Sequence, residues 1–122
     1  MHLLRLTVVA LLTFVAAILP AAAEKRVALV IGNGNYEHID RLAYPATDSR
    51  AMRDVLKKLG FEIVYGENLD KRSLERTIGR FARATEGADV ALVYFAGHGA
   101  TFGDIPYIVP IDAQFSTLED MP

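Results

Sequence analysis

The sequence predicts an α/β fold in which a mostly parallel sheet carries helices on both faces. Three apolar stretches rich in β-branched and aromatic residues alternate with two amphipathic stretches, in the order strand, helix, strand, helix, strand. Connections of this kind between parallel strands form right-handed βαβ units. The 122 residues, of which 52% are hydrophobic and 23% charged, indicate a single globular domain.

Residues 1–23 have the pattern of an export signal. Arg5 precedes an apolar run from Leu6 to Leu19, and Ala21-Ala22-Ala23 forms an A-x-A cleavage site. The 14 residues of the run are fewer than the roughly 20 that span a bilayer, so no stable membrane span is expected after cleavage. We therefore expect an exported protein, periplasmic or secreted, that begins at residue 24.

Charge and cysteine content limit the classes of partner and chemistry. Cleavage would remove one of the 13 Lys and Arg residues, leaving 12 against 15 Asp and Glu, a net charge of −3. No basic patch of the kind that binds phosphate backbones stands out, so a nucleic-acid partner is not expected. Because the chain has no cysteine, packing alone must stabilise it, and it brings no thiol of its own.

The first strand and the first helix are expected on either side of a polar loop. The continuous apolar run from Val27 to Ile31 suits a strand buried on both faces. A glycine-containing loop follows and is closed by Pro45. From Thr47 the pattern becomes helical, with Thr47 or Asp48 as the cap and Gly60 after the last turn. The apolar positions at helical spacing are Met52, Val55, Leu56 and Leu59.

The second half of the chain repeats this alternation. A strand is expected over Phe61–Tyr65, followed by a helix capped by Asp70 and ended by Gly87. Gly79 inside this helix suggests close packing against the sheet. The third strand, "DVALVYFA", is expected to be the most buried of the three, and "PYIVPID" offers a short extended piece. The apolar positions of the second helix are Leu74, Ile78, Phe81, Ala82 and Thr85.

The last residues, "FSTLEDMP", suggest that more structure follows. Ser116-x-x-Glu119 is a capping-box pattern, which predicts the start of a helix. A sheet of three strands would also leave an exposed edge, which complete domains usually pair or cover. We therefore expect residues 24–122 to be the N-terminal portion of a larger domain.

His98 is the principal candidate for catalysis. In open parallel sheets the reacting groups gather beyond the carboxyl ends of the strands, where both Gly32 and Gly97-His98-Gly99 fall. An imidazole titrates near neutral pH and can act as a general base, and the Gly99 N–H could donate to a developing oxyanion. On the residues alone, an ordinary tight turn with no role for His98 stays open as the alternative.

Two other chemistries are disfavoured by the same region. Gly32-x-Gly34 follows a strand as in a phosphate loop, but the third glycine, the Gly-Lys-Ser/Thr sequence and a following helix are missing. No metal site is expected, because His98 has no partner at ligand spacing, no H-E-x-x-H occurs and there are no thiolates.

Asp48 and Arg41 are candidate substrate-binding residues. Asp48 is either a simple helix cap or, at the same rim, an anchor for a basic substrate side chain. Arg41 is either a solvated loop charge or a guanidinium that binds a carboxylate. His38 is assigned to solvent and His2 to the export signal.

Four blocks of the sequence resemble the large-subunit region of the caspase-like cysteine peptidases, especially the bacterial metacaspase-type branch. They are "RVALVIGNGNY", "LAYPATDSRAMRDVLKKLGFEI", "DVALVYFAGHG" and "YIVPIDA", in the family's order between Lys25 and Ala113. The strand followed by Gly-His-Gly carries most of the weight. The resemblance implies a caspase-like three-layer fold, present here as its N-terminal part, and endopeptidase activity by a Cys-His dyad.

The resemblance also assigns roles to single residues. His98 matches the catalytic histidine, which activates the thiol and protonates the leaving amine, and Gly99 matches a donor of the oxyanion hole. Asp48 matches the acidic residue that metacaspase-type members use to bind Arg or Lys at P1, although the box reads Thr47-Asp48-Ser49 rather than the more usual Asn-Asp-Ala. Arg41 lies one position out of register with the arginine that animal caspases use for a P1 aspartate. We prefer Asp48 and basic specificity.

The cysteine of the family would lie on the next core strand, about 50 residues after the histidine and thus beyond Pro122. We therefore expect these 122 residues alone to be inactive, and their partners to be the missing C-terminal part of the domain and a peptide or protein substrate. No cofactor is implied, and a dependence on calcium stays open. The alternatives are a non-catalytic caspase-fold module that binds peptides or partner domains and, third, a small nucleotide-binding α/β domain.

Overall fold

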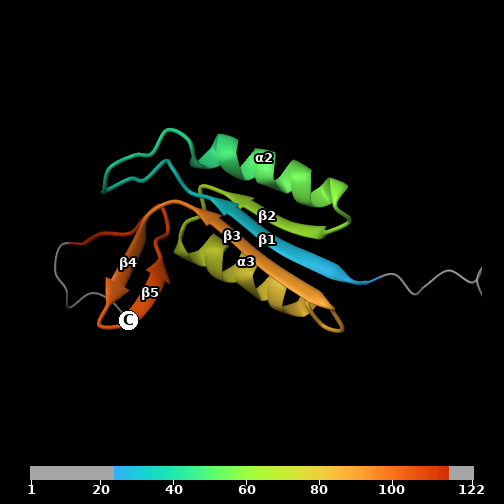
Figure 1. Ribbon diagram of the computed structural model, residues 1–122. Helices are drawn as coiled ribbons and strands as arrows, with labels where there is room; N and C mark the ends of the chain where they lie inside the picture. Colours follow the sequence, from blue (N-terminus) through green and yellow to red (C-terminus); the bar gives the residue numbers. More distant parts are fainter. Residues whose placement is uncertain (1–23, 116–122) are drawn as a thin grey trace, which may run out of the picture.

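The computed structural model of the chain describes residues 24–115 (Figure 1). The expected export signal at residues 1–23 and the helix expected from Ser116 lie outside the described residues. Between residues 24 and 115, no helix is both long enough and apolar enough to cross a membrane.

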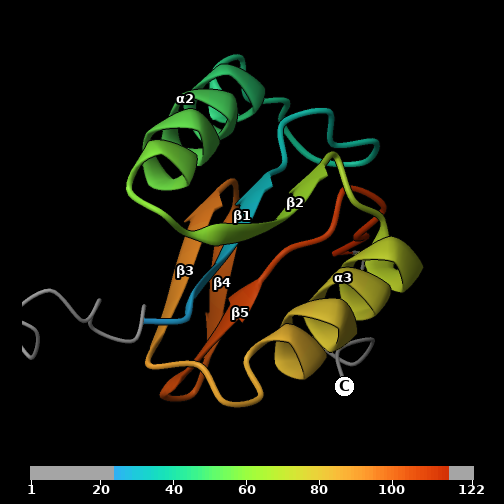
Figure 2. The ribbon, with the colours of Figure 1, turned by 90° about the vertical axis from the view of Figure 1, so that its right-hand side faces the viewer.

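The described elements form a small parallel sheet with one helix on each face and a separate hairpin. β1, β2 and β3 are parallel in the order β2-β1-β3, whereas β4 and β5 pair antiparallel. Helices α2 and α3 lie on opposite faces of the sheet (Figure 2). This arrangement confirms the predicted α/β fold. The elements are β1 (Arg26–Gly32), α2 (Pro45–Lys58), β2 (Glu62–Glu67), α3 (Lys71–Ala84), β3 (Val90–Ala96), β4 (Gly99–Phe102) and β5 (Ile105–Ile108).

β1 is the centre of the hydrophobic core. It pairs with a strand on each side and is covered by a helix on each face, so every residue of the run Val27 to Ile31 is buried. Successive side chains of a strand point to opposite faces, and β1 follows this rule. One set of its side chains packs with Leu56 of α2, and the other set packs with Leu74 of α3.

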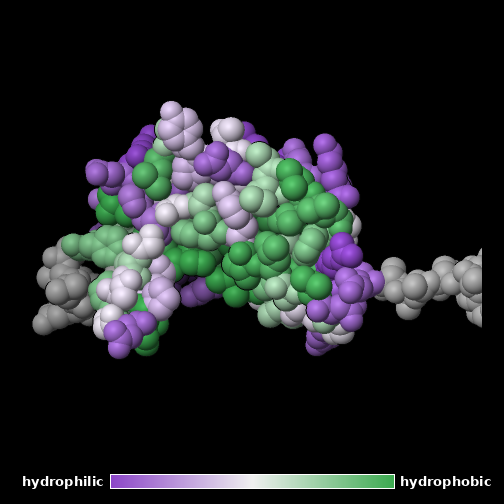
Figure 3. Space-filling model, viewed as in Figure 1, coloured by the Kyte–Doolittle hydropathy of each residue, from purple (hydrophilic) through white to green (hydrophobic). Residues whose placement is uncertain are grey.

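β3 is more exposed than the sequence suggested. The expectation that it would be the most buried strand is wrong, because it lies at the edge of the described sheet. Val93 is 56% exposed and Val90 is 36% exposed. Figure 3 shows hydrophobic residues gathered over β3 between the two helices. The apolar composition of β3 predicts burial, but the burial observed here depends on the position of the strand at the sheet edge.

The helix termini agree with the sequence in one case and differ in the other. α2 begins at Pro45, and its N-cap Tyr44 makes no side-chain cap, so the expected cap at Thr47 or Asp48 is wrong. Proline suits the first helical position because its φ is already helical and it needs no N–H partner. The cap at Asp70 is confirmed, since its carboxylate accepts from the Ser73 N–H at 2.8 Å.

The hairpin that follows His98 was expected only in part. The sequence predicts one extended piece over "PYIVPID", but only its first residues belong to β5, which pairs with β4 in a register that sets Gly99 opposite Ile108. Gly103 makes the turn with φ +58°. The hairpin directs the following segment back across the sheet end, where Ile111 N donates to Leu69 O at 3.0 Å.

Candidate active site

The candidate site lies at the carboxyl ends of β1 and β3. The parallel register sets Gly32 opposite Ala96, and the pairing continues one step further because Asn33 N donates to Ala96 O at 2.8 Å. The loop after β1 and the Gly97-His98-Gly99 turn therefore begin side by side. The structure confirms that both candidate segments lie on one rim of the sheet.

His98 is held at three of its four hydrogen-bonding groups. Its N–H donates to the Tyr36 hydroxyl at 2.9 Å, and its carbonyl oxygen accepts from Val109 N at 3.1 Å. Its ring atom Nε2 lies 2.8 Å from the carbonyl oxygen of Asp40. The backbone and one end of the ring are thus fixed, and within residues 24–115 only Nδ1 makes no hydrogen bond.

The Asp40 contact determines the tautomer of the ring. A carbonyl oxygen only accepts hydrogen bonds, so Nε2 must carry the hydrogen, and the lone pair of the neutral ring is then on Nδ1. An imidazole in this state can take a proton at Nδ1 while Nε2–H stays bonded to Asp40. This is the protonation state that a general base requires.

Tyr36 connects His98 to the segment after β5. Its side chain is 1% exposed, and its hydroxyl donates to Val109 O at 3.0 Å while it accepts from His98 N. Its ring centroid lies 4.6 Å from that of His98. Burial raises the pKa of Tyr36, so the hydroxyl keeps its proton at neutral pH. Sequence reasoning missed this residue, although an aromatic side chain in a polar loop was a signal of burial.

Gly97 gives Tyr36 room to reach His98. A Cβ at this position would lie 2.6 Å from Phe95 Cζ, 2.8 Å from Tyr36 Oη and 3.0 Å from Asn33 O. The last of these atoms belongs to the backbone and cannot turn away. The first glycine of Gly-His-Gly is therefore required by packing beneath His98.

Two asparagines hold the loop after β1 to the end of β2. Asn33 is fully buried, and its side-chain oxygen accepts from Leu69 N at 2.9 Å. In return, Asn68 accepts from Gly34 N at 2.9 Å and from Asn35 N at 3.0 Å. These are the amides that a phosphate loop would offer to a nucleotide, and here a side chain already occupies them. The arrangement argues against the nucleotide-binding alternative.

The other three predicted site residues differ in how closely the structure brings them to His98. Gly99 is the first residue of β4 and directly follows His98. Arg41 is exposed and directly follows Asp40, which anchors the ring. Asp48 is exposed in the first turn of α2, and its carboxylate has no hydrogen bond or ion pair within residues 24–115. The structure thus brings Gly99 and the Arg41 loop to His98 and gives no contact between His98 and Asp48.

A polar network lies beside Asp48 and joins α2 to β2. Arg50 donates to both carboxylate oxygens of Glu67, from Nε to Oε1 and from Nη2 to Oε2, the latter at 2.7 Å. The Tyr65 hydroxyl donates to Glu67 Oε1 at 2.6 Å. The hydrogen bond from Arg50 lowers the pKa of Glu67. The Ser49 hydroxyl lies 3.1 Å from the Tyr65 hydroxyl. The network fixes the start of α2 against the end of β2.

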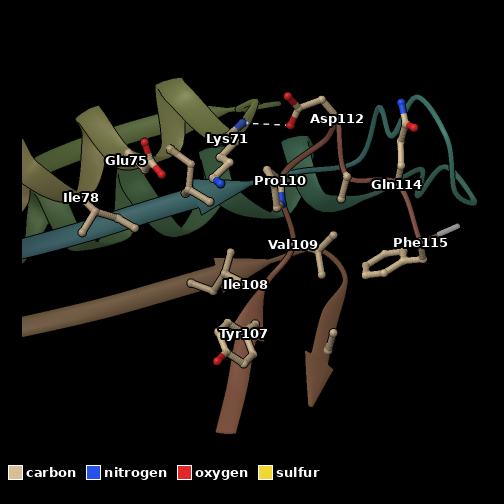
Figure 4. Close-up of a pocket in the computed structure, with 13 residues that line it drawn as sticks. Lys71, Glu75, Ile78, Tyr107, Ile108, Val109, Pro110, Asp112, Gln114 and Phe115 are labelled. Carbon is tan, nitrogen blue, oxygen red and sulfur yellow. Dashed lines mark hydrogen bonds between the residues drawn. The ribbon is translucent and has the colours of Figure 1, made fainter. Parts of the chain in front are cut away.

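A mainly apolar pocket lies at the carboxyl-terminal end of the described chain (Figure 4). It has a volume of about 330 Å³ and lies between α3, β5 and the segment that ends at Phe115. Lys71 N donates to Asp112 at one end of it. His98 does not line this pocket, so we do not include it in the candidate site.

A comparison with known protein families places the chain in one of them. The sequence pattern of the family described as "Caspase domain" matches residues 25–121. The chain belongs to the caspase domain family. The match covers both β1 and the Gly-His-Gly turn, and it confirms the family that the four sequence blocks suggested. The bacterial metacaspase-type branch is not tested by it.

Curated proteins similar to this caspase domain come from mammals. The mucosa-associated lymphoid tissue lymphoma translocation protein 1 of Homo sapiens is 33% identical over 92 residues, which are 75% of this chain and 11% of that protein. Caspase-13 of Bos taurus is 28% identical over 105 residues, 78% of this chain and 28% of that protein. Caspase-1 of Rattus norvegicus is 28% identical over 114 residues, 85% and 28% respectively. The chain spans less than a third of each of these relatives.

Proposed function

We propose that this caspase domain supplies the histidine of a cysteine endopeptidase. Membership of the family supports a cysteine-protease type of function in general. The observation that carries the proposal is the state of His98, whose backbone and Nε2 are anchored while Nδ1 keeps a lone pair. A ring held in this way is prepared to exchange a proton with a nucleophile.

In the proposed reaction His98 acts first as a general base and then as a general acid. Nδ1 takes the proton of a cysteine thiol, and the thiolate attacks the scissile carbonyl carbon. The Gly99 N–H donates to the oxyanion of the tetrahedral intermediate. The imidazolium then returns its proton to the leaving amine, and water, deprotonated by the same ring, hydrolyses the thioester. The Nε2–H bond to Asp40 spreads part of the positive charge that the ring carries between these steps.

The unpaired edge of β3 offers a position for the strand that would carry the cysteine thiol. Within residues 24–115, β3 pairs only with β1, so its other edge is unpaired. A parallel strand added there would end at the same rim as β3, beside His98. We propose that such a strand carries the cysteine, that it follows Pro122 in a longer product of the gene, and that the 122 residues without it are inactive.

Asp48 and Arg41 make opposite predictions for the P1 residue. Exposed in the first turn of α2, the Asp48 carboxylate is free to pair with an Arg or Lys side chain of a substrate. Arg41 would instead pair with a P1 aspartate. We propose basic specificity through Asp48. Asp48→Ala should lower kcat/KM for Arg and Lys substrates, whereas Arg41→Ala, the matched control, should leave it unchanged.

The decisive experiment is an assay of the longer protein with fluorogenic peptides that carry Arg, Lys or Asp at P1. His98→Ala should lower kcat by about a thousandfold or more, with an unchanged circular dichroism spectrum. Undiminished cleavage by this variant would remove His98 from the mechanism. The absence of cysteine from the chain also keeps the non-catalytic module as a second candidate. A longer protein with Ser, Ala or Gly in place of the expected cysteine, which binds peptides without cleaving them, would establish that candidate.

We also propose that the protein is exported, with cleavage after Ala23. The support is the pattern of Arg5, the apolar run and the A-x-A site. N-terminal sequencing of protein from the periplasm or the medium should begin at Glu24. A product that begins at Met1 and stays in the cytoplasm would contradict the proposal.

A further inference from the structure

The outward side of α3 gathers four arginines into one narrow stripe. Helix geometry rotates each residue by about 100°, which puts Arg72, Arg83, Arg76 and Arg80 within an arc of about 80°. All four are exposed. We call this surface the arginine face. Along the sequence these residues are three or four positions apart, so the cluster becomes apparent only when they are placed on the helix.

The arginine face forms no ion pair within residues 24–115, whereas three other arginines of the fold do. Arg26, Arg50 and Arg53 each form an ion pair with a Glu or Asp. In the part of the chain that the structure describes, no arginine of α3 forms one. Asp70 at the start of the helix is attracted to Arg76 and Arg72, which contribute to its lowered pKa after its hydrogen bonds to Ser73. Like charges four residues apart repel each other, so the rest of the row is unfavourable for the isolated helix. A partner of opposite charge would remove that repulsion.

Contacts inside the helix already orient three of these side chains. Arg76 Nη2 donates to the Ser73 hydroxyl at 3.1 Å, and Arg80 Nη2 lies 3.5 Å from the Thr77 hydroxyl. Arg83 leans back over Gly79, where a Cβ would meet only its Nη1, at 3.6 Å. The expectation that Gly79 permits close packing against the sheet is therefore wrong. The glycine instead deepens an open hollow that follows the arginine face.

The spacing of the arginines matches an extended peptide. Arg72, Arg76 and Arg80 are separated by about 6 Å along the helix axis. Side chains on one side of an extended strand repeat at about 6.7 Å. A carboxylate at every second residue of such a peptide would therefore meet successive guanidinium groups, which bind carboxylates through two parallel hydrogen bonds.

Other polyanions fit the arginine face less well. A helix that binds a membrane inserts its apolar side, but the apolar side of α3 packs against the sheet through Leu74. No aromatic side chain lines the hollow to stack on a nucleotide base. A long polyanion would also meet the net charge of −2 of the whole chain. Glu75 borders the hollow on one side and limits the favourable region to the arginines.

We propose that the arginine face binds an extended acidic peptide with carboxylates at alternate positions, presented by a partner protein. This inference is independent of the proposed peptidase function, because α3 contributes no residue to the His98 site. The bound peptide would run along α3 for about 16 Å, the rise from Arg72 to Arg83. Such a surface would recruit an acidic segment to the domain without occupying the site.

The test measures the binding of fluorescein-labelled peptides to the 122-residue chain by anisotropy in 150 mM NaCl. The first peptide is Glu-Ser-Glu-Ser-Glu-Ser-Glu, the second has the same composition with the glutamates in one block, and the third has Gln for Glu. The alternating peptide should bind about fivefold or more tighter than the block peptide, and the Gln peptide should not bind. Equal affinity for the alternating and block peptides would overturn the proposal in favour of plain charge attraction.

Charge variants locate the binding surface. Arg76→Glu with Arg80→Glu should weaken binding of the alternating peptide about tenfold or more. Lys57→Glu with Lys58→Glu on α2 makes the same change of charge elsewhere and should leave it within about twofold. If the double Glu variant loses its circular dichroism spectrum, Arg76→Gln with Arg80→Gln replaces it and should also weaken binding. Tighter binding of phosphatidylglycerol vesicles or of a single-stranded oligonucleotide than of the peptide would overturn the proposal.

Discussion

The Tyr36 hydroxyl forms a bridge of two hydrogen bonds between His98 N and Val109 O. Tyr36→Phe, which removes this one oxygen atom, tests whether the bridge positions His98. The aromatic ring and its packing stay, while the hydroxyl that accepts from His98 N and donates to Val109 O is lost. Val109 O keeps a second contact, with Asn33 Nδ2 at 3.4 Å. The unsatisfied His98 N–H is therefore the main cost. A buried donor without a partner lowers the free energy of unfolding by about 1–3 kcal/mol.

Two measurements follow this change. In urea, where a domain of this size has an m-value of about 1 kcal/mol per M, the unfolding midpoint should fall by about 1 M or more. In ¹⁵N NMR spectra, His98 of the unchanged chain should be mainly the Nε2–H tautomer, and the variant should show a larger share of the Nδ1–H form. The second readout separates a role in positioning His98 from a role in stability alone.

Tyr44→Phe is the matched control, because Tyr44 is 73% exposed and its hydroxyl makes no hydrogen bond within the described residues. Its urea midpoint should stay within the small range that is typical of surface substitutions. If Tyr36→Phe behaves like Tyr44→Phe in both measurements, the bridge does not hold His98 and the reasoning is refuted.

Three further predictions concern the support of the site. Gly97→Ala places a Cβ 3.0 Å from a backbone oxygen and should lower the free energy of unfolding in urea by about 1–3 kcal/mol. Gly99→Ala, whose Cβ would have its nearest contact at 3.7 Å, should be nearly neutral. Equal urea midpoints for the two variants would contradict the packing argument. Asn68→Ala removes two hydrogen bonds at a residue with φ +49° and should lower the free energy of unfolding by about 1–3 kcal/mol. Asn68→Asp keeps the acceptor oxygen and should restore most of this stability; if it does not, the side-chain acceptor is not the cause. Because Arg50 lowers the folded-state pKa of Glu67, this carboxylate stabilises the fold above its unfolded value near 4.5, and the contribution is lost as the pH falls through the lower folded value. The urea midpoint of Glu67→Gln should therefore fall less between pH 7 and pH 3 than that of the unchanged chain, and an identical fall would contradict the assignment.

The features that the sequence predicted correctly depend on short-range patterns. The apolar run of β1 and the helical periodicity around Leu56 and Leu74 reflect burial that each element needs wherever it packs. The Asp70 cap is a contact with Ser73 in its own helix. The common rim of Gly32 and His98 followed from a rule about parallel strands, which needs only the order of the elements.

The features that the sequence did not predict depend on partners far along the chain. Tyr36 acquires its role from His98, 62 residues away, and from Val109, 73 residues away. Nothing in the local pattern of a polar loop encodes those distances. The exposure of β3 likewise follows from its position at the sheet edge, and the α2 cap was wrong because Pro45 starts the helix without a side-chain acceptor.

The same long-range pairing has a kinetic consequence. β1 and β2 join residues about 35 apart, such as Val27 and Glu62, whereas β1 and β3 join Arg26 to Val90. Longer loops cost more entropy to close, and non-local pairing slows folding. The first βαβ unit is therefore expected to form before β3 docks. His98 gains its anchors at Tyr36 and Asp40 only in that later step, so the arrangement around His98 should mature after most of the secondary structure has formed.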